Sequence, residues 1–210
     1  MADDYFKRNN WNKKDEYYTP SILVDCIIPH LQKKDFKTIW CPFDTENSEF
    51  VIRLREEGFN VLHSHIWEGK DFFHYRPEQD FDAIVSNPPF TSKLKVLQRL
   101  YTIGKPFAVI MGLPILNYQE VGEFFHANQN RGIHLELLIV DKKVSFDGNT
   151  ASFNNSYFCF DILKSNIMFA HVEHNNTKRK HVPSRMYADM PDEFKLPQTK
   201  LFQKWGAEEE

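Results

Sequence analysis

The stretch Phe81-Asp82-Ala83-Ile84-Val85-Ser86-Asn87-Pro88-Pro89-Phe90 joins a short apolar run to a polar, proline-rich end. Consecutive apolar positions are typical of a strand covered on both faces, as in a parallel sheet. An Asn carboxamide placed where such a strand ends can accept hydrogen bonds from a planar amine, and an aromatic ring can stack on the plane of that amine. A plain turn is the alternative, since Asn and Pro are turn residues.

Outward from this stretch, apolar strand signals alternate with helical ones. Thr19-Pro20 predicts a cap and first position of a helix, in which Pro29 is expected to cause a kink or a break. Further helices are expected from Asn47-Ser48 to Gly58, over 94–101 and over 121–125. Strands are expected at 38–41, 60–64, 83–85, 107–111 and 135–140. This alternation predicts an α/β fold with a mostly parallel sheet and helices on both faces.

The end of this region follows a different pattern. Residues 157–163 and 167–171 read as two strands joined by the short link Lys164-Ser165-Asn166. A short polar link between two apolar runs predicts an antiparallel hairpin, here at the edge of the sheet.

We therefore divide the chain into three parts. Residues 1–18 are predicted to form a flexible N-terminal segment, 19–172 the folded domain and 173–210 an irregular C-terminal tail. A length of 210 residues suits one domain of ordinary size.

Composition excludes several classes of protein. The net charge of −3 excludes a uniformly basic nucleic-acid binder, so phosphate contacts must come from local clusters. The widely spaced Cys26, Cys41 and Cys159 form neither a disulfide framework nor a zinc motif. The first ten residues, MADDYFKRNN, lack the apolar core of a secretion signal, and no apolar stretch approaches the length of a membrane span. A cytoplasmic protein that makes no membrane contact is expected.

Unusual residues gather where several predicted strands end. They are Cys41-Pro42-Phe43-Asp44, His63-Ser64-His65, Asp71-Phe72-Phe73 and the Asn-Pro-Pro-Phe run. Ligands of open α/β sheets bind at the carboxyl ends of the strands, so these segments predict one binding edge. His63, His65 and His74 lack an acid or Cys to complete a ligand set, and no metal site is predicted.

On these motifs the chain resembles the compact, phage-type S-adenosylmethionine-dependent DNA adenine-N6 methyltransferases, over about residues 16–165. The resemblance implies a Rossmann-like class I methyltransferase fold. It implies that Asn87 and the carbonyl of Pro88 accept hydrogen bonds from the target amine, with Pro89 completing the motif and Phe90 stacking on the base. Such a base has to be flipped out of the duplex. The expected cellular setting is a bacterium or a phage-infected host cell.

The same resemblance implies a set of cofactor contacts. Tyr18, Thr19 and Pro20 would lie against the methionine part of S-adenosylmethionine, at a helix start whose N–H groups suit a carboxylate. Asp71 and Phe72 would hold the adenine. The loop Cys41-Pro42-Phe43-Asp44 would meet the methionine amine or the ribose, and Ser64 or His65 stands where the family has an acid.

The chain departs from the family at this loop. The usual Asp-Pro-x-x-Gly-x-Gly reads Cys41-Pro42-Phe43-Asp44-Thr45-Glu46-Asn47 here. Thr45 stands in place of a glycine and does not tolerate a left-handed backbone, whereas Asn47 does. Cofactor binding is therefore predicted less firmly than the catalytic geometry.

DNA is the expected partner. Lys93, Lys95, Arg99 and Lys105 follow the Asn-Pro-Pro-Phe run with no acid between residues 83 and 119. The segments 145–148 and 153–157 resemble the region that closes over the target base, which makes Phe146 a candidate for base stacking or for the core. Lys178, Arg179, Lys180 and Arg185 form a second basic cluster, a phosphate grip or simply a charged tail.

Two alternatives stay open. The Asn-Pro-Pro-aromatic motif also serves methylation of RNA bases and of protein glutamine. A degenerate fold that binds DNA or a host protein without catalysis is the other. Sequence specificity is relaxed, built into residues 142–156 or supplied by a second subunit.

Overall fold

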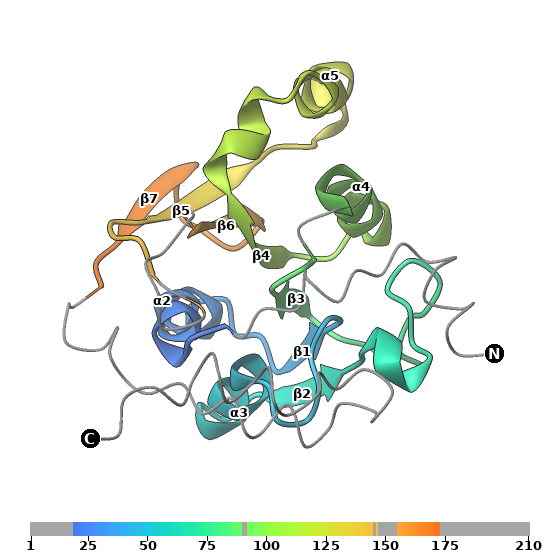
Figure 1. The fold of residues 1–210 in the computed structure, drawn as a ribbon, viewed down its shortest axis with the longest axis vertical. Coiled ribbons are helices and arrows are strands. Elements are labelled where there is room, and N and C mark those ends of the chain that lie inside the picture. Colours follow the sequence, from blue (N-terminus) through green and yellow to red (C-terminus); the bar gives the residue numbers. More distant parts are fainter. Residues whose placement is uncertain (1–18, 90–91, 145, 147–154, 173–210) are drawn as a thin grey trace, which may run out of the picture.

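The computed structural model describes residues 19–89, 92–144, 146 and 155–172. Their centre is one seven-stranded sheet of order β2-β1-β3-β4-β6-β5-β7 (Figure 1). The strands are β1 (Thr38–Cys41), β2 (Asn60–His63), β3 (Ala83–Ser86), β4 (Phe107–Gly112), β5 (Glu136–Val140), β6 (Asn155–Phe160) and β7 (Ile167–Ala170). All neighbours pair in parallel except β6, which is antiparallel to β4 and β5. The predicted mostly parallel, Rossmann-like α/β fold is confirmed.

Helices cover both faces of this sheet (Figure 1). The helices α2 (Ser21–Gln32) and α3 (Glu49–Glu56) pack on one face, and α4 (Lys93–Ile103) and α5 (Gln119–Asn128) on the other. Short 3-10 turns lie at η2 (Ile66–Glu68), η4 (Leu113–Asn117) and η5 (Gln129–Arg131). Each face of the sheet has its own hydrophobic core, and alternate residues of each strand belong to one core or the other, because successive side chains point to opposite faces.

The helix after Thr19-Pro20 forms as predicted, with two differences in detail. Pro20 itself is the extended cap residue, with ψ 140°, and no side chain caps the helix. Pro29 lies inside α2 without ending it. Pro29 is exposed, so the backbone carbonyl that loses its partner can turn to water.

The predicted hairpin of 157–163 and 167–171 is wrong. The strand β5 lies between β6 and β7, and β7 pairs with β5 in parallel, from Leu137 opposite Ile167 to Val140 opposite Ala170. The antiparallel strand is therefore internal and the edge strand is parallel. The link Lys164-Ser165-Asn166 passes the start of β5 and leads to β7 on the other side of that strand. There Leu137 N–H donates to Asn166 O at 2.7 Å.

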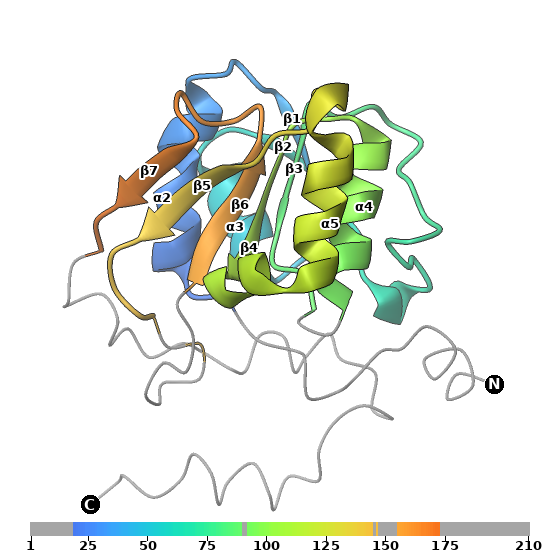
Figure 2. The ribbon, with the colours of Figure 1, turned by 90° about the horizontal axis from the view of Figure 1, so that it is seen from above.

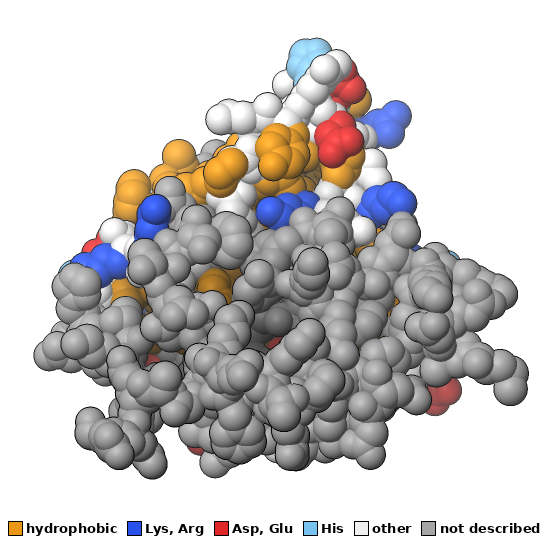
Figure 3. Space-filling model, viewed as in Figure 1, with side chains coloured by type: hydrophobic (Ala, Val, Ile, Leu, Met, Phe, Trp, Pro, Cys, Tyr) orange, Lys and Arg blue, Asp and Glu red, His pale blue; other side chains and the backbone are white. Residues whose placement is uncertain are grey.

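No helix of the described residues covers one face of β5 and β7, and hydrophobic side chains gather there and over η4 (Figure 3). Ile167 and Phe169 are exposed on β7, as is Tyr118 after η4. In the described part of the chain, no helix combines the length and the apolar character that crossing a bilayer requires.

Strand order reverses between β1 and β3, which are neighbours although β2 lies between them in the chain. The loops after β1, β2, β3 and β4 therefore share the edge at the carboxyl ends of these strands, the lower edge in Figure 2. The proposed flexible segment 1–18 and tail 173–210 lie outside the described residues.

The pKa values of buried thiols and phenols make the stability of the fold depend on pH in the alkaline range. Burial, with the nearby charges of Asp25 and Asp141, raises the pKa of Cys26 from 9.0 to about 11. Burial also raises the pKa of Cys159 and of Tyr157, whose hydroxyl donates to Leu23 O at 2.8 Å. The folded state therefore keeps protons that the unfolded chain releases.

We expect stability to fall as pH rises above about 9. The contribution of Cys26 is fully present below the unfolded pKa of 9.0 and is lost as pH rises to about 11. Urea unfolding at several alkaline pH values measures the loss in free energy of unfolding. Between pH 9 and 11 we expect this loss to be smaller in Cys26→Ala than in the parent protein by about 1–3 kcal/mol. An unchanged slope in Cys26→Ala would contradict this assignment.

Candidate functional site

Asn87 lies directly after β3, at the edge where the strand order reverses. Its side-chain oxygen Oδ1 is buried and has no hydrogen-bond partner among the described residues. A buried acceptor without a donor costs about 1–3 kcal/mol, so such atoms are rare and often belong to binding sites. Pro88 is buried and Pro89 half-buried beside it, and neither has a backbone N–H that could satisfy this oxygen. Phe90 lies outside the described residues.

Asp44 joins the ends of three strands. Its carboxylate is buried, and Oδ2 accepts a hydrogen bond from Ser86 Oγ at the end of β3. Its backbone N–H donates to Ser64 O after β2 at 3.2 Å. A buried carboxylate is retained only where it is well hydrogen-bonded or meets a cation. Asp44 is therefore the acidic group of this edge, as the sequence predicts.

The loop that departs from the family pattern forms without glycine. In the described chain the only non-glycine residues with positive φ are Asp35 and Asp161, so neither Thr45 nor Asn47 adopts the left-handed backbone. Thr45 N–H donates to Ser48 Oγ at 3.0 Å and Ser48 N–H to Thr45 O at 3.1 Å. These bonds close the turn before α3, and the buried Thr45 Oγ1 is left without a partner in the described part of the chain.

Cys41 stands where the family has an acid, but it supplies no charge. Its side chain is fully buried, and burial raises the pKa of its thiol well above 9.0, with the nearby Asp44 raising it further. The thiol is uncharged at neutral pH. Cys41 packs in the core, and Pro42, also buried, turns the chain toward Asp44.

Ser64 and His65 use their side chains within the fold. Ser64 Oγ accepts from Trp40 Nε1 at 3.0 Å, and His65 Nδ1 accepts from Trp67 N–H at 3.2 Å as the cap of η2. Both residues are buried. They hold the end of β2 in place, and neither supplies the negative charge of the missing family acid.

Asp71 and Phe72 also have structural contacts. Asp71 Oδ1 accepts from Phe73 N–H at 3.1 Å, and Oδ2 lies 2.8 Å from His74 Nδ1. Phe72 is buried, with ring centroids 4.8 Å from Phe43 and 5.7 Å from Phe73. Phe43 and Phe73 are only partly buried, which makes their rings the accessible part of this aromatic group. The sequence places Phe43 among the cofactor contacts, and it places Phe73 only in a segment expected at the binding edge.

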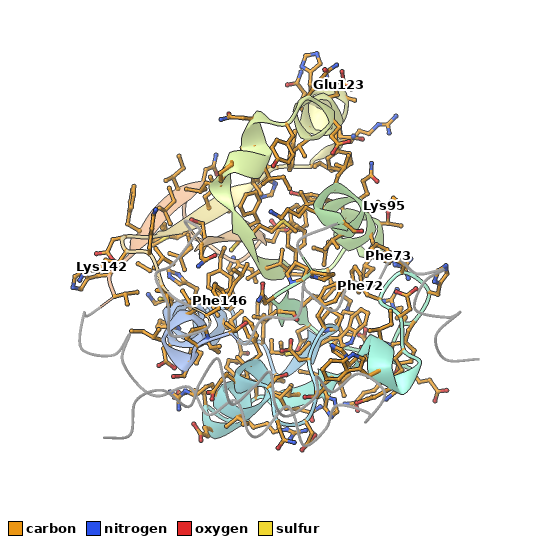
Figure 4. The ribbon with its side chains drawn as sticks, viewed as in Figure 1. Phe72, Phe73, Lys95, Glu123, Lys142 and Phe146 are labelled. Carbon is orange, nitrogen blue, oxygen red and sulfur yellow. The ribbon has the colours of Figure 1, made fainter. Side chains whose placement is uncertain are left out.

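The remaining predicted residues differ in burial and position. Thr19 is buried before α2, and Tyr18 lies outside the described residues. Lys95 is exposed on α4, which packs on the other face of the sheet (Figure 4). Lys93 is half-buried two residues earlier, at the first position of the same helix. Phe146 is buried in the core beside α2, so the core role is the one that the structure shows.

Two residues of β6 belong to the 153–157 segment that the resemblance places over the target base. Asn155 and Ser156 lie opposite Gly112 and Met111 at the carboxyl end of β4. Asn155 Oδ1 and Ser156 Oγ are buried without partners in the described ranges, like Asn87 Oδ1 and Thr45 Oγ1. The antiparallel pairing that brings them to this edge is a long-range feature, and the sequence gives no local signal for it.

No family model and no curated protein sequence matches this chain. Among solved structures it is similar to a proposed methyltransferase from Thermoplasma acidophilum, with 16% identity, a TM-score of 0.37, and coverage of 74% of this chain and 69% of the other. It is also similar to a release-factor-specific protein-(glutamine-N5) methyltransferase from Alicyclobacillus acidocaldarius. That match has 15% identity, a TM-score of 0.34, and coverage of 66% of this chain and 89% of the other. The assignment of the fold rests on the strand order and pairing of this chain itself.

Proposed function

We propose that this chain transfers a methyl group from S-adenosylmethionine to the N6 amine of adenine in DNA. The observation that carries the proposal is Oδ1 of Asn87 at the end of β3, which is buried and has no hydrogen-bond partner among the described residues. An acceptor in this position suits an N–H donor supplied by a substrate, because a bound amine would remove the cost of the unsatisfied group.

The chemistry needs no strong base. Asn87 Oδ1 and the Pro88 carbonyl would accept the two hydrogens of the amine, which directs the nitrogen lone pair toward the methyl donor. The amine nitrogen would attack the methyl carbon directly while the bond from that carbon to sulfur breaks, so that the neutral thioether leaves, and the methylated amine would then release its extra proton to water. S-adenosylmethionine supplies the electrophilic methyl group when bound.

The residues of the edge fit such a cofactor. Asp44 offers a buried carboxylate to a cationic or hydroxyl group, and Thr45 Oγ1 and Ser156 Oγ are buried polar atoms without partners among the described residues. Phe43 and Phe73 offer partly buried rings to a planar base. The mostly parallel sheet with one antiparallel strand is also consistent with a class I methyltransferase fold.

DNA as substrate is supported by local charge. Lys95 is exposed in the first turn of α4, which begins a few residues after Asn87. Cations beside the edge would meet phosphates of a strand whose target base is turned into the site.

A planar amide of protein glutamine, or the amine of an RNA base, is the second candidate. The net charge of −3 favours it, because phosphate binding usually draws on a basic surface. The same Asn87 geometry serves either amine, so the substrate is decided by experiment.

Expression in a methylation-free bacterial host tests the proposal. We expect N6-methyladenine in the host DNA by mass spectrometry and modified-base sequencing, and none when Asn87 is replaced by Ala. Calorimetric titration with S-adenosylmethionine is run on the same protein. If the protein binds the cofactor but the host DNA stays unmodified, and methylated glutamine or RNA is found instead, the second candidate is the substrate. No binding at millimolar cofactor would show a degenerate fold.

A further inference from the structure

A separate group of side chains lies at the opposite edge of the sheet. His134 precedes β5, Glu136 is its first residue, and Asp161 follows the end of β6. The ligand atoms of these three residues all lie within 4.8 Å of one another. Asn155 and Asp161 stand at opposite ends of β6, about 20 Å apart along the strand. The group is therefore distinct from the candidate methyl-transfer site.

The distances within this group suit a shared ion better than direct hydrogen bonds. His134 Nε2 lies 3.4 Å from Glu136 Oε1 and 3.4 Å from Asp161 Oδ1. Charge-assisted hydrogen bonds between such groups measure about 2.7–2.9 Å. The edge of a tetrahedron of N and O ligands around Zn²⁺, with bonds of about 2.0–2.1 Å, measures about 3.3–3.4 Å.

The imidazole of His134 is oriented as a metal ligand would be. Its Nδ1 lies 3.3 Å from Gly132 O, an arrangement in which an Nδ1–H donates to the carbonyl. The neutral ring then presents the lone pair of Nε2 to the two carboxylates, which are acceptors as well. Metal-bound histidines generally hold their second nitrogen in this way.

Glu136 is the buried residue of this group, and backbone N–H groups hold its carboxylate in place. It is only 5% exposed, and its Oε2 accepts from Ile162 N–H at 3.0 Å and from Leu163 N–H at 2.7 Å. Two backbone donors stabilise the ionised carboxylate and leave Oε1 directed at His134. The buried Glu136 carboxylate thus faces the lone pair of His134 Nε2, and two acceptors that face each other favour a cation between them.

We propose that His134 Nε2, Glu136 Oε1 and Asp161 Oδ1 bind a zinc ion. Three protein ligands leave a fourth position for water, and the site is reachable because the side chains of His134 and Asp161 are about half exposed. The ion joins the start of β5 to the end of β6. It stabilises the fold and takes no part in methyl transfer, so the proposal does not depend on the substrate of the other site.

The rival arrangement is a doubly protonated His134 that bridges the two carboxylates without a metal. Metal-free protein titrated with Zn²⁺, and with Co²⁺ as a coloured substitute, separates the two. We expect a single zinc to bind, a tetrahedral Co²⁺ absorption spectrum and a higher melting temperature with zinc. His134→Gln and Asp161→Asn, both at accessible positions, are expected to weaken binding at least about tenfold.

His171→Gln is the matched control, because His171 pairs with Asp141 alone among the described residues and that pair lacks a third ligand. This variant should bind zinc as the parent protein does. Equal zinc affinity in the parent and in Asp161→Asn, or no tetrahedral Co²⁺ spectrum, would overturn the site in favour of the protonated bridge.

Discussion

Replacing Asn87 by Ala is expected to reduce methyl transfer by about 100- to 1,000-fold, the usual effect of removing one oriented group that acts in the transition state. The oxygen that is lost has no partner in the described part of the chain, so the variant loses no internal hydrogen bond through it. We therefore expect unchanged affinity for S-adenosylmethionine and an unchanged or slightly higher melting temperature. Loss of activity without loss of stability separates a catalytic Asn from a structural one.

The matched control is Asn60→Ala at the first residue of β2. Asn60 is exposed, and its Nδ2 donates only to Thr38 Oγ1, at 3.2 Å, in the described structure. It lies at the amino end of its strand, away from the candidate site. Turnover and calorimetric affinity should both match the parent protein. Retained turnover in Asn87→Ala would show that the amine is not held as proposed.

Local patterns predict the elements well, because strand and helix periodicity are properties of short segments. The strands at 38–41 and 60–63 and the helix that ends before Gly58, where φ is +89°, form where the sequence places them. The partner of a strand is not local information. Residues 157–163 and 167–171 both read as strands in the sequence, but the separation of β6 from β7 by β5 depends on contacts far along the chain.

The candidate site shows the same limit. The sequence identifies Asn87 and Asp44, whose surroundings follow from their place at strand ends. It cannot show that Phe72 is buried while Phe73 is accessible, since both belong to one aromatic run. It also overstates the need for glycine between Cys41 and Ser48, because the loop closes through the hydroxyl of Ser48 instead of a left-handed turn.

Asp44→Asn is expected to weaken binding of S-adenosylmethionine by about 10- to 100-fold, the range for a hydrogen bond to a charged group. The substitution keeps the size of the side chain and an acceptor for Ser86 Oγ, and it removes only the charge at the ends of β1, β2 and β3. Turnover at saturating cofactor should change much less than affinity. Calorimetry and the cofactor dependence of the rate measure the two effects separately.

The same change at Asp82 is the control, because it removes a charge from the opposite end of β3. Asp82 Oδ2 accepts from the backbone N–H groups of Lys37 at 2.7 Å and Thr38 at 2.8 Å. Asp82→Asn should therefore lower the free energy of unfolding while leaving cofactor affinity intact. If Asp44→Asn behaves like Asp82→Asn, with lower stability and normal affinity for S-adenosylmethionine, Asp44 only stabilises the strand ends and does not bind the cofactor. The cofactor would then have to be held by Thr45, Ser156 and the aromatic rings, without a carboxylate.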